Sequence, residues 1–342
     1  MINTVIALVP AVAFLLALAL MDSFKLVRPA SILSALACGA VAAGGSLWLH
    51  DWLLHVRHIP PEIVTRYVAP VTEETAKALL LVVLIATARV GFLVDAAVQG
   101  FAVGTGFALV ENLIYLHVMP DAPVALWIVR GLGTAVLQGA TTSIFAMISK
   151  TLADRHPGRI AFVFVPGWVV AVVIHSAFNH RLLPPVAQML LLLVALPLLV
   201  LWVFERSERA TRDWIGGGLD LDLVLLDLIA SEAFAVTRFG QYLAELRTRM
   251  PGAVVADMFC LLRLELELSV QAKAFLLARK AGVDLPIDDD LYASLDEREH
   301  LMESIGKMGL LALKPLQVTT HRDVWHGHLL RQRGGEAGKL RS

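Results

Sequence analysis

Long apolar runs separated by short polar connections fill the N-terminal part of the chain. A helix of about 20 apolar residues is long enough to cross the hydrocarbon core of a bilayer. Runs of about this length lie at residues 2–21, 31–50, 63–87, 93–117, 124–149, 160–181 and 185–204. The pattern therefore predicts seven transmembrane helices within residues 1–204.

After Phe204 the apolar runs give way to leucines at helical spacing with charged residues between them. Three such segments lie at residues 219–250, 253–281 and 291–308. This spacing predicts amphipathic helices of a water-soluble bundle. Pro251 and Gly252 predict a turn between the first two helices, and the three glycines at 216–218 predict a hinge before them.

The expected fold is all-α: a polytopic membrane helix bundle of about seven transmembrane helices with a small C-terminal cytoplasmic helical domain. We expect the membrane bundle at 1–204, a juxtamembrane linker at 205–215, the helical bundle at 216–314 and a flexible tail at 315–342. Basic residues concentrate in alternate connections, namely Lys25, Arg28, Arg89, Lys150, Arg155, Arg159, Arg206, Arg209 and Arg212. Because cytoplasmic loops are enriched in Lys and Arg, we expect a multi-pass protein of the bacterial inner membrane, with the N-terminus outside and the C-terminus in the cytoplasm.

Composition agrees with a membrane protein and narrows the partners. Of the 342 residues, 57% are hydrophobic, and the mean hydropathy is +0.69, which is too apolar for a soluble protein of this size. The 29 Lys and Arg residues nearly balance the 30 Asp and Glu residues, so no nucleic-acid partner is expected. Cys38 and Cys260 are too few to indicate a disulfide framework or a cysteine metal site. Membrane lipid is the expected surrounding partner.

The third predicted span carries Glu73, Glu74 and Lys77 within its apolar run. A charged side chain near the bilayer centre costs about 2.5–3.5 kcal/mol on insertion scales. Lys77 is three residues from Glu74 and four from Glu73, so it can reach both carboxylates along one helix face. One alternative is an ion pair that only holds helices together; intramembrane charge nevertheless favours a functional site.

Three more spans carry polar residues that lipid would reject. They are Glu111 in the fourth span, Arg130 and Gln138 in the fifth, and His175 and Asn179 in the sixth. Counting along each helix at about 1.5 Å per residue places most of them in the outer half of the bilayer. We therefore expect these side chains to share a cavity with Glu73 and Glu74.

Carboxylates and a histidine in one cavity can perform hydrolysis in two ways. They can hold a divalent metal ion with an open position for water, whose proton a nearby glutamate accepts. Alternatively, paired glutamates can activate water by general acid–base catalysis without a metal. In either case Asn179 or Arg130 could stabilise the oxyanion of a tetrahedral intermediate.

Three of these segments resemble motifs of one family. Glu73-Glu74-Thr-Ala-Lys77 is similar to the EExxK signature of the PrsW family of intramembrane proteases, distant relatives of the type II CAAX prenyl proteases. Phe107 to Asn112 resembles that family's FxxxEN element, and His175 to Asn179 its HxxxN/D element. The resemblance covers roughly residues 60–182. It implies site-1 cleavage of membrane-anchored protein substrates such as anti-sigma factors, with Glu73, Glu74, Glu111 and His175 in the active site.

The full expected catalytic set is Glu73, Glu74, Lys77, Glu111, Arg130, His175 and Asn179. The chain departs from the family at Gln138, where a histidine is usual, and glutamine is a poor metal ligand compared with imidazole. The expected metal ligands are Glu74, Glu111 and His175, with Gln138 in place of that histidine, and the expected ion is zinc or another divalent metal. Two alternatives remain: a catalytically inactive membrane scaffold, and an ion or proton transporter.

Overall fold

The computed structural model describes residues 2–22, 27–156, 160–283 and 289–313, and every regular element within them is helical. The chain divides into two compact units, Met1–Glu208 and Arg209–Ser342. The division falls close to the predicted end of the membrane bundle. The tail expected at 315–342 lies outside the described residues.

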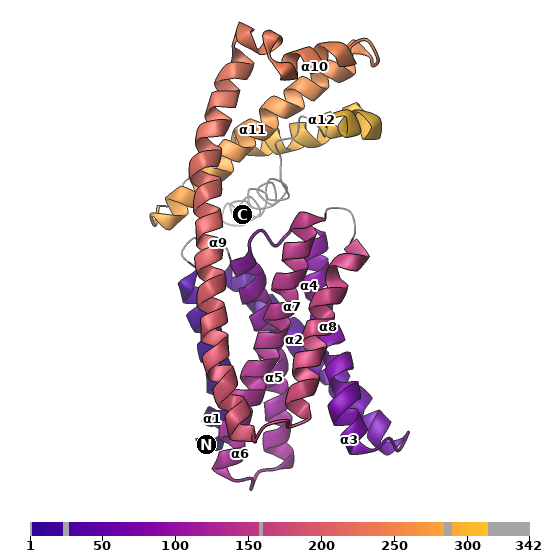
Figure 1. The fold of residues 1–342 in the computed structure, drawn as a ribbon, viewed down its shortest axis with the longest axis vertical. Coiled ribbons are helices and arrows are strands. Elements are labelled where there is room, and N and C mark those ends of the chain that lie inside the picture. Colours follow the sequence, from indigo (N-terminus) through magenta and orange to yellow (C-terminus); the bar gives the residue numbers. More distant parts are fainter. Residues whose placement is uncertain (1, 23–26, 157–159, 284–288, 314–342) are drawn as a thin grey trace. The chain divides into compact units, whose positions relative to one another are not determined.

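The first unit is a bundle of long helices, shown from indigo to magenta in Figure 1. Its elements are α1 (Ile2–Met21), α2 (Pro29–His55), α3 (Pro61–Ile63), η1 (Val64–Val68), α4 (Ala69–Ala86), α5 (Leu93–Val118), α6 (Val124–Val129), η2 (Arg130–Thr134), α7 (Ala135–Arg155), α8 (Ile160–Asn179) and α9 (Pro185–Ala230). Two of them, η1 and η2, are π-helical turns that continue directly into α4 and α7. Such widened turns occur often at functional sites.

Helix α5 is the centre of this unit, because it is buried along most of its length and packs against α1, α2 and α7. Glycines allow the close approach. A Cβ at Gly104 would lie 2.1 Å from the carbonyl oxygen of Gln138 on α7, and a Cβ at Gly106 would lie 2.0 Å from that of Leu36 on α2. Larger residues at either position would force α5 away from the helix that it packs against.

Six helical stretches of the described residues are long and apolar enough to cross a membrane: Ile2–Met21, Pro29–His55, Leu93–Val118, Val124–Arg155, Phe162–Asn179 and Pro185–Ala230. The third predicted span corresponds to α4, which does not meet this measure. It has 18 residues, and three of them, Glu73, Glu74 and Lys77, are charged. All three charged side chains are buried, and α4 packs against α2, α7 and α8. The helical membrane bundle is therefore confirmed, with α4 as its polar member.

The second unit contains the C-terminal part of α9 together with η3 (Glu232–Val236), α10 (Arg238–Leu246), α11 (Gly252–Lys280) and α12 (Asp289–Leu313). Its core is formed by buried side chains of α10, α11 and α12 such as Leu243, Met258, Leu268 and Leu295. The predicted turn at Pro251 lies between α10 and α11. The predicted helix at 219–250 is instead divided, because α9 ends at Ala230 and α10 begins at Arg238.

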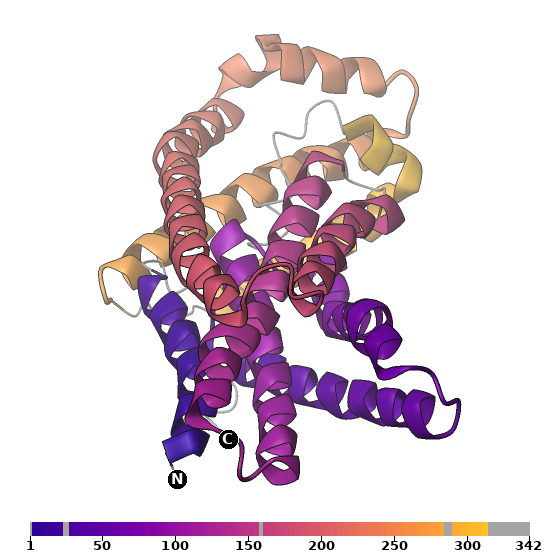
Figure 2. The same ribbon diagram turned by 60° about the horizontal axis from the view of Figure 1, so that its bottom comes forward.

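Helix α9 runs unbroken through residues 205–215, expected to be a linker, and through the glycines at 216–218, expected to be a hinge. Figure 2 shows the same continuous helix from a second direction. Packing explains the last of these glycines. A Cβ at Gly218 would lie 2.7 Å from Nζ of Lys273, which forms a buried ion pair of 2.6 Å with Asp222. Gly218 therefore leaves room for a lysine of α11 beside α9, and the three glycines lie within a helix.

Candidate active site

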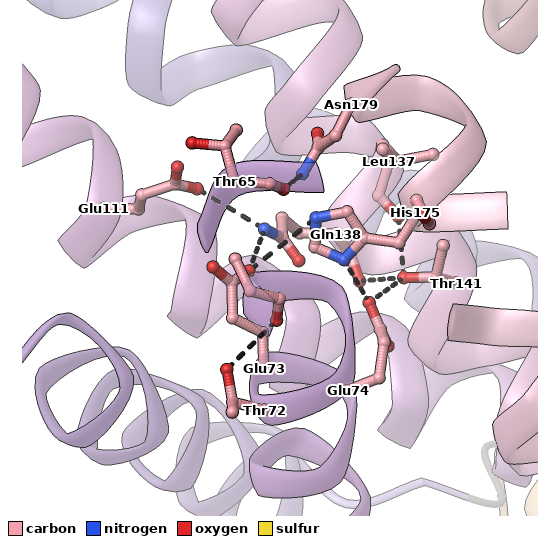
Figure 3. Close-up of polar contacts among 12 residues, drawn as sticks. Thr65, Thr72, Glu73, Glu74, Glu111, Leu137, Gln138, Thr141, His175 and Asn179 are labelled. Atoms are coloured by element: carbon pink, nitrogen blue, oxygen red, sulfur yellow. Dashed lines mark hydrogen bonds and ion pairs between the residues drawn. The ribbon is translucent and has the colours of Figure 1, made fainter. Parts of the chain in front are cut away.

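Polar side chains from five helical segments meet inside the first unit, as Figure 3 shows for most of them. Helix α4 contributes Glu73, Glu74 and Lys77, and the other residues come from α2, α5, η2–α7 and α8. The sequence brings the three α4 residues to one side because they are three and four residues apart. Helices α7 and α8 pack against α4, and this packing brings Gln138, Thr141 and His175 next to the α4 residues.

Glu74 is one of the most buried residues of this cluster, and one of its two oxygens accepts three hydrogen bonds. Its Oε1 accepts from Lys77 Nζ at 2.7 Å, from His175 Nδ1 at 2.7 Å and from Thr141 Oγ1 at 3.0 Å. Because a carboxylate only accepts, the bond from His175 places a proton on Nδ1. The second ring nitrogen of His175, Nε2, is thereby directed toward Glu73, whose Oε2 is 3.8 Å away.

Glu73 has longer and fewer contacts than its neighbour. Its Oε2 accepts a hydrogen bond of 3.0 Å from Gln138 Nε2. Its two oxygens face imidazole nitrogens beyond hydrogen-bond distance, Oε2 facing His175 Nε2 at 3.8 Å and Oε1 facing His50 Nδ1 at 3.9 Å. The Glu73 side chain is 10% exposed, against 1% for Glu74. Of the two carboxylates, Glu73 is therefore the more exposed and the one with fewer hydrogen bonds.

Gln138 connects three charged residues through its two amide ends. Its Nε2 donates to Glu73 at 3.0 Å and to Glu111 Oε2 at 3.4 Å, while its Oε1 accepts from Lys77 Nζ. An amide can do this because it carries both donors and acceptors. The close packing at Gly104 holds the backbone of Gln138 against α5. Gln138 thus fixes the two carboxylates relative to the lysine.

Glu111 and Arg130 form a second ion pair at a more accessible edge of the cluster. Arg130 NH2 donates to Glu111 Oε1 at 3.0 Å, and its Nε donates to Asn112 Oδ1 at 3.0 Å. The guanidinium carbon also lies 3.6 Å from the ring centroid of Tyr115. Both charged side chains are 12–13% exposed. Glu111 and Asn112, two residues of one predicted motif, therefore orient the arginine of the next helix.

Asn179 is the predicted site residue that the structure places apart from the carboxylates. Its Nδ2 donates to the backbone oxygen of Thr65 at 2.9 Å, and Ser176 Oγ on the same helix donates to that of Arg66 at 2.6 Å. Both acceptors belong to the π-helical turn η1. In this arrangement Asn179 fastens α8 to the turn that leads into α4. The other six expected residues lie in one connected network.

His50 and Thr141 are members of the cluster that were not among the predicted site residues. His50 comes from α2, is buried, and contacts Thr72 and Glu73. A histidine inside an apolar span itself indicates a functional site, and His50 lies in the predicted span 31–50. Phe107, the first residue of its motif, also has a visible role, because Lys77 Nζ lies 5.1 Å from its ring centroid.

The cluster as arranged does not fit a metal ion. Among the described residues, no three His, Cys, Asp or Glu side chains come together in a way that could hold one. The expected ligands are engaged elsewhere, since Glu74 Oε1 accepts three hydrogen bonds and Glu111 is paired with Arg130. The Gln138 amide occupies the position between Glu73 and Glu111. The ligand set of Glu74, Glu111 and His175 therefore stays a prediction.

Comparison with known proteins gives one match. The model of a family described as PrsW family intramembrane metalloprotease matches residues 25–203 of this chain, which include every residue of the cluster. No curated protein and no solved structure matches the chain.

Proposed function

The chain belongs to the PrsW family of intramembrane metalloproteases and is an intramembrane protease; we propose that it cleaves membrane-anchored proteins with a water molecule activated by Glu73. The observation that carries this proposal is the difference between the two adjacent glutamates. Glu74 is committed to three donors, whereas Glu73 accepts one hydrogen bond and has two imidazoles nearby. A general base needs a free lone pair within reach of water.

In the proposed reaction Glu73 takes a proton from the water as its oxygen attacks the carbonyl carbon of the scissile peptide bond. The resulting tetrahedral intermediate carries a negative oxygen. Glu73 then returns the proton to the amide nitrogen, the carbon–nitrogen bond breaks, and a carboxylic acid and an amine leave. The description of the family as metalloproteases suggests a metal. The proposed steps use side chains of the chain alone, since the described residues, as they are arranged, form no group that could hold one.

Arg130 is the proposed stabiliser of the oxyanion. A guanidinium has five N–H donors. In Arg130, one terminal nitrogen donates to Glu111 and Nε donates to Asn112. The proposed oxyanion donors are the N–H groups that do not contact Glu111, Asn112 or Tyr115. Glu74 and Lys77 have the opposite role: they hold His175 and Gln138 in place from the buried side.

The substrate is proposed to enter from the side of Glu111 and Arg130, since their side chains and that of Glu73 are more exposed than Lys77, Glu74 and His175. We propose single-span proteins such as anti-sigma factors as substrates, because the site lies among helices suited to a membrane. We further propose the bacterial inner membrane with the C-terminus in the cytoplasm. Activity of an alkaline phosphatase fused after Ser342 would contradict that orientation.

The test is cleavage of a single-span anti-sigma factor by purified protein in vesicles of phosphatidylethanolamine and phosphatidylglycerol. Glu73→Gln should lower kcat by at least about 10³-fold, since it removes the base and keeps the shape. The matched control is Glu62→Gln, on the exposed surface of α3, which should behave as wild type. Equal cleavage by wild type and Glu73→Gln would reject Glu73 as the base. Family membership favours this activity over the transporter and scaffold alternatives.

A further inference from the structure

We propose that His50 of α2 orients the attacking water, as a partner of Glu73 that lies outside the three motifs of the sequence. This inference rests on the proposed role of Glu73 as the base. His50 is close to this base: its Nδ1 lies 3.9 Å from Glu73 Oε1, and its side chain is 11% exposed. Helix α2 is otherwise apolar enough to cross a membrane. An imidazole placed there needs polar partners, and it finds them on α4.

Thr72 determines which nitrogen of His50 carries the proton. His50 Nε2 lies 2.8 Å from Thr72 Oγ1, and that hydroxyl donates its only proton to the backbone oxygens of Val68 at 3.0 Å and Ala69 at 3.2 Å. In the proposed arrangement the hydroxyl acts as the acceptor toward His50, so the proton of the neutral imidazole lies on Nε2. Nδ1 is left with a lone pair, and it faces Glu73.

His175 is arranged in the same way on the other side of the carboxylate. Its Nδ1 is committed to Glu74 at 2.7 Å, and its Nε2 faces Glu73 Oε2 at 3.8 Å. With both imidazoles neutral, Glu73 has an unprotonated imidazole nitrogen opposite each of its oxygens. Two acceptors cannot hydrogen-bond each other, and distances of 3.8–3.9 Å are too long for a direct bond in any case.

A water molecule satisfies such a pair of acceptors, because it has two protons to donate. One proton goes to Glu73, which removes it during attack, and the other is held by an imidazole nitrogen. Both protons are then fixed, and a lone pair of the oxygen is left for the substrate carbonyl. His50 accepts a hydrogen bond in this step and takes up no proton.

Exposure decides which imidazole has this role. The His50 side chain is 11% exposed and that of His175 is 3% exposed. His50 thus lies on the same accessible side as Glu73 and Glu111, where a substrate can arrive. His175 lies on the buried side, where it is tied to Glu74. The geometry assigns the attacking water to the space between Glu73 and His50.

The kinetic test uses the same vesicles and the same single-span anti-sigma factor. His50→Ala should lower kcat by about 10²-fold with little change in KM, since loss of orientation affects the reaction and not the binding. His50→Asn should recover part of the rate, because its side-chain oxygen can take the place of Nδ1. The matched control is His55→Ala on the same helix, whose exposed side chain pairs with Asp51 and should be dispensable.

The second partner, Thr72, gives an independent pair of variants. Thr72→Ser keeps the accepting hydroxyl and should retain the wild-type rate. Thr72→Val keeps the shape, removes the acceptor for Nε2–H, and should lower kcat by about tenfold or more. If His50 served only packing, Thr72→Val would leave kcat unchanged and His50→Asn would be no better than His50→Ala, and either result would overturn the proposal.

A spectroscopic readout separates failure of this inference from failure of the proposed function. In ¹⁵N spectra of histidine-labelled protein, the resonances missing in His50→Asn identify His50 among the 11 histidines. A protonated Nε2 and an unprotonated Nδ1 are expected. A protonated Nδ1 would overturn the role of His50 even with an active enzyme. Loss of cleavage in Glu73→Gln but not in His50→Ala would reject only this inference, and a wild type that cleaves nothing would reject both.

Discussion

Two buried lysine–carboxylate pairs, one in each unit of the molecule, allow a direct comparison. In the first unit Lys77 pairs with Glu74 at 2.7 Å, and in the second Lys273 pairs with Asp222 at 2.6 Å. Each lysine also lies 5.1 Å from the centroid of an aromatic ring, Phe107 in one case and Trp214 in the other. In isolation the two pairs are almost the same.

Their surroundings differ in the number of ionisable groups that converge on the pair. Around Lys77 and Glu74, hydrogen bonds and short ionic contacts extend to His175, Gln138 and Glu73. The pair in the second unit joins α9 to α11 in a unit whose core is made of leucines and other apolar side chains. A buried pair is weak evidence of anything beyond packing. Lys77 needs only one carboxylate to balance its charge, and Glu74 supplies it. The additional carboxylate nearby, Glu73, is what indicates a catalytic site.

The largest expected difference between the two pairs is in catalysis. Glu74→Gln replaces a carboxylate that only accepts by an amide that can also donate, so the proton of His175 is no longer fixed on Nδ1. Loss of such an orienting carboxylate lowers kcat by on the order of 10³–10⁴-fold in triad enzymes. We expect a loss of at least about 10³-fold in vesicles, with the protein still inserted and monodisperse in detergent. Thr141→Val removes only one of the three donors to Glu74 and should have a much smaller effect. Wild-type turnover in Glu74→Gln would place the carboxylate outside the reaction.

The corresponding change in the second unit should affect stability instead. Asp222→Asn leaves Lys273 as an unpaired buried charge, and breaking a buried pair costs about 3–5 kcal/mol. We expect a lower midpoint of thermal unfolding for the full chain and a kcat within about threefold of wild type at temperatures where the variant is folded. The double variant Asp222→Leu with Lys273→Met should regain most of the lost stability. A kcat that falls as far as in Glu74→Gln would show that the two pairs do not differ in function.

Much of the fold was predictable because the apolar runs have the length that a bilayer requires. The helical class, the membrane bundle and the division near residue 208 follow from that pattern. The break in the predicted helix at 219–250 was not predictable, because leucine spacing continues across it. The unbroken path of α9 through the glycines was hidden for another reason: it depends on Lys273, which is 55 positions further along the chain than Gly218.

The site was predictable where polar residues interrupt apolar spans, and six of the seven expected residues lie in one network. Spacing within a helix shows which side chains share a face, but it does not show which backbone group lies opposite. For that reason Asn179, one turn from His175, was expected near the oxyanion and instead contacts Thr65. His50 lies outside the three motifs, although a histidine in an apolar helix is the same physical indication of a functional site.

The smallest expected effect concerns Gln138. This residue links Glu73 and Glu111, the two carboxylates of the site that are not paired with Lys77. Its amide lies between Glu73 and Glu111 and accepts from Lys77. Replacing it with histidine removes the amide and adds an imidazole nitrogen beside Glu73, Glu111 and His175, which together would make a nitrogen and oxygen donor set of the kind that zinc and cobalt bind. We expect Gln138→His to bind cobalt at least about tenfold more tightly than wild type in a spectroscopic titration. Gln138→Asn, which keeps an amide, is the control and should not gain binding.

Because wild-type catalysis is proposed to use Glu73 and His50, chelators should change its rate by less than about twofold. Equally tight cobalt binding in wild type and Gln138→His, together with loss of wild-type activity in chelator, would mean that the side chains rearrange around a metal and that Glu73 does not act alone.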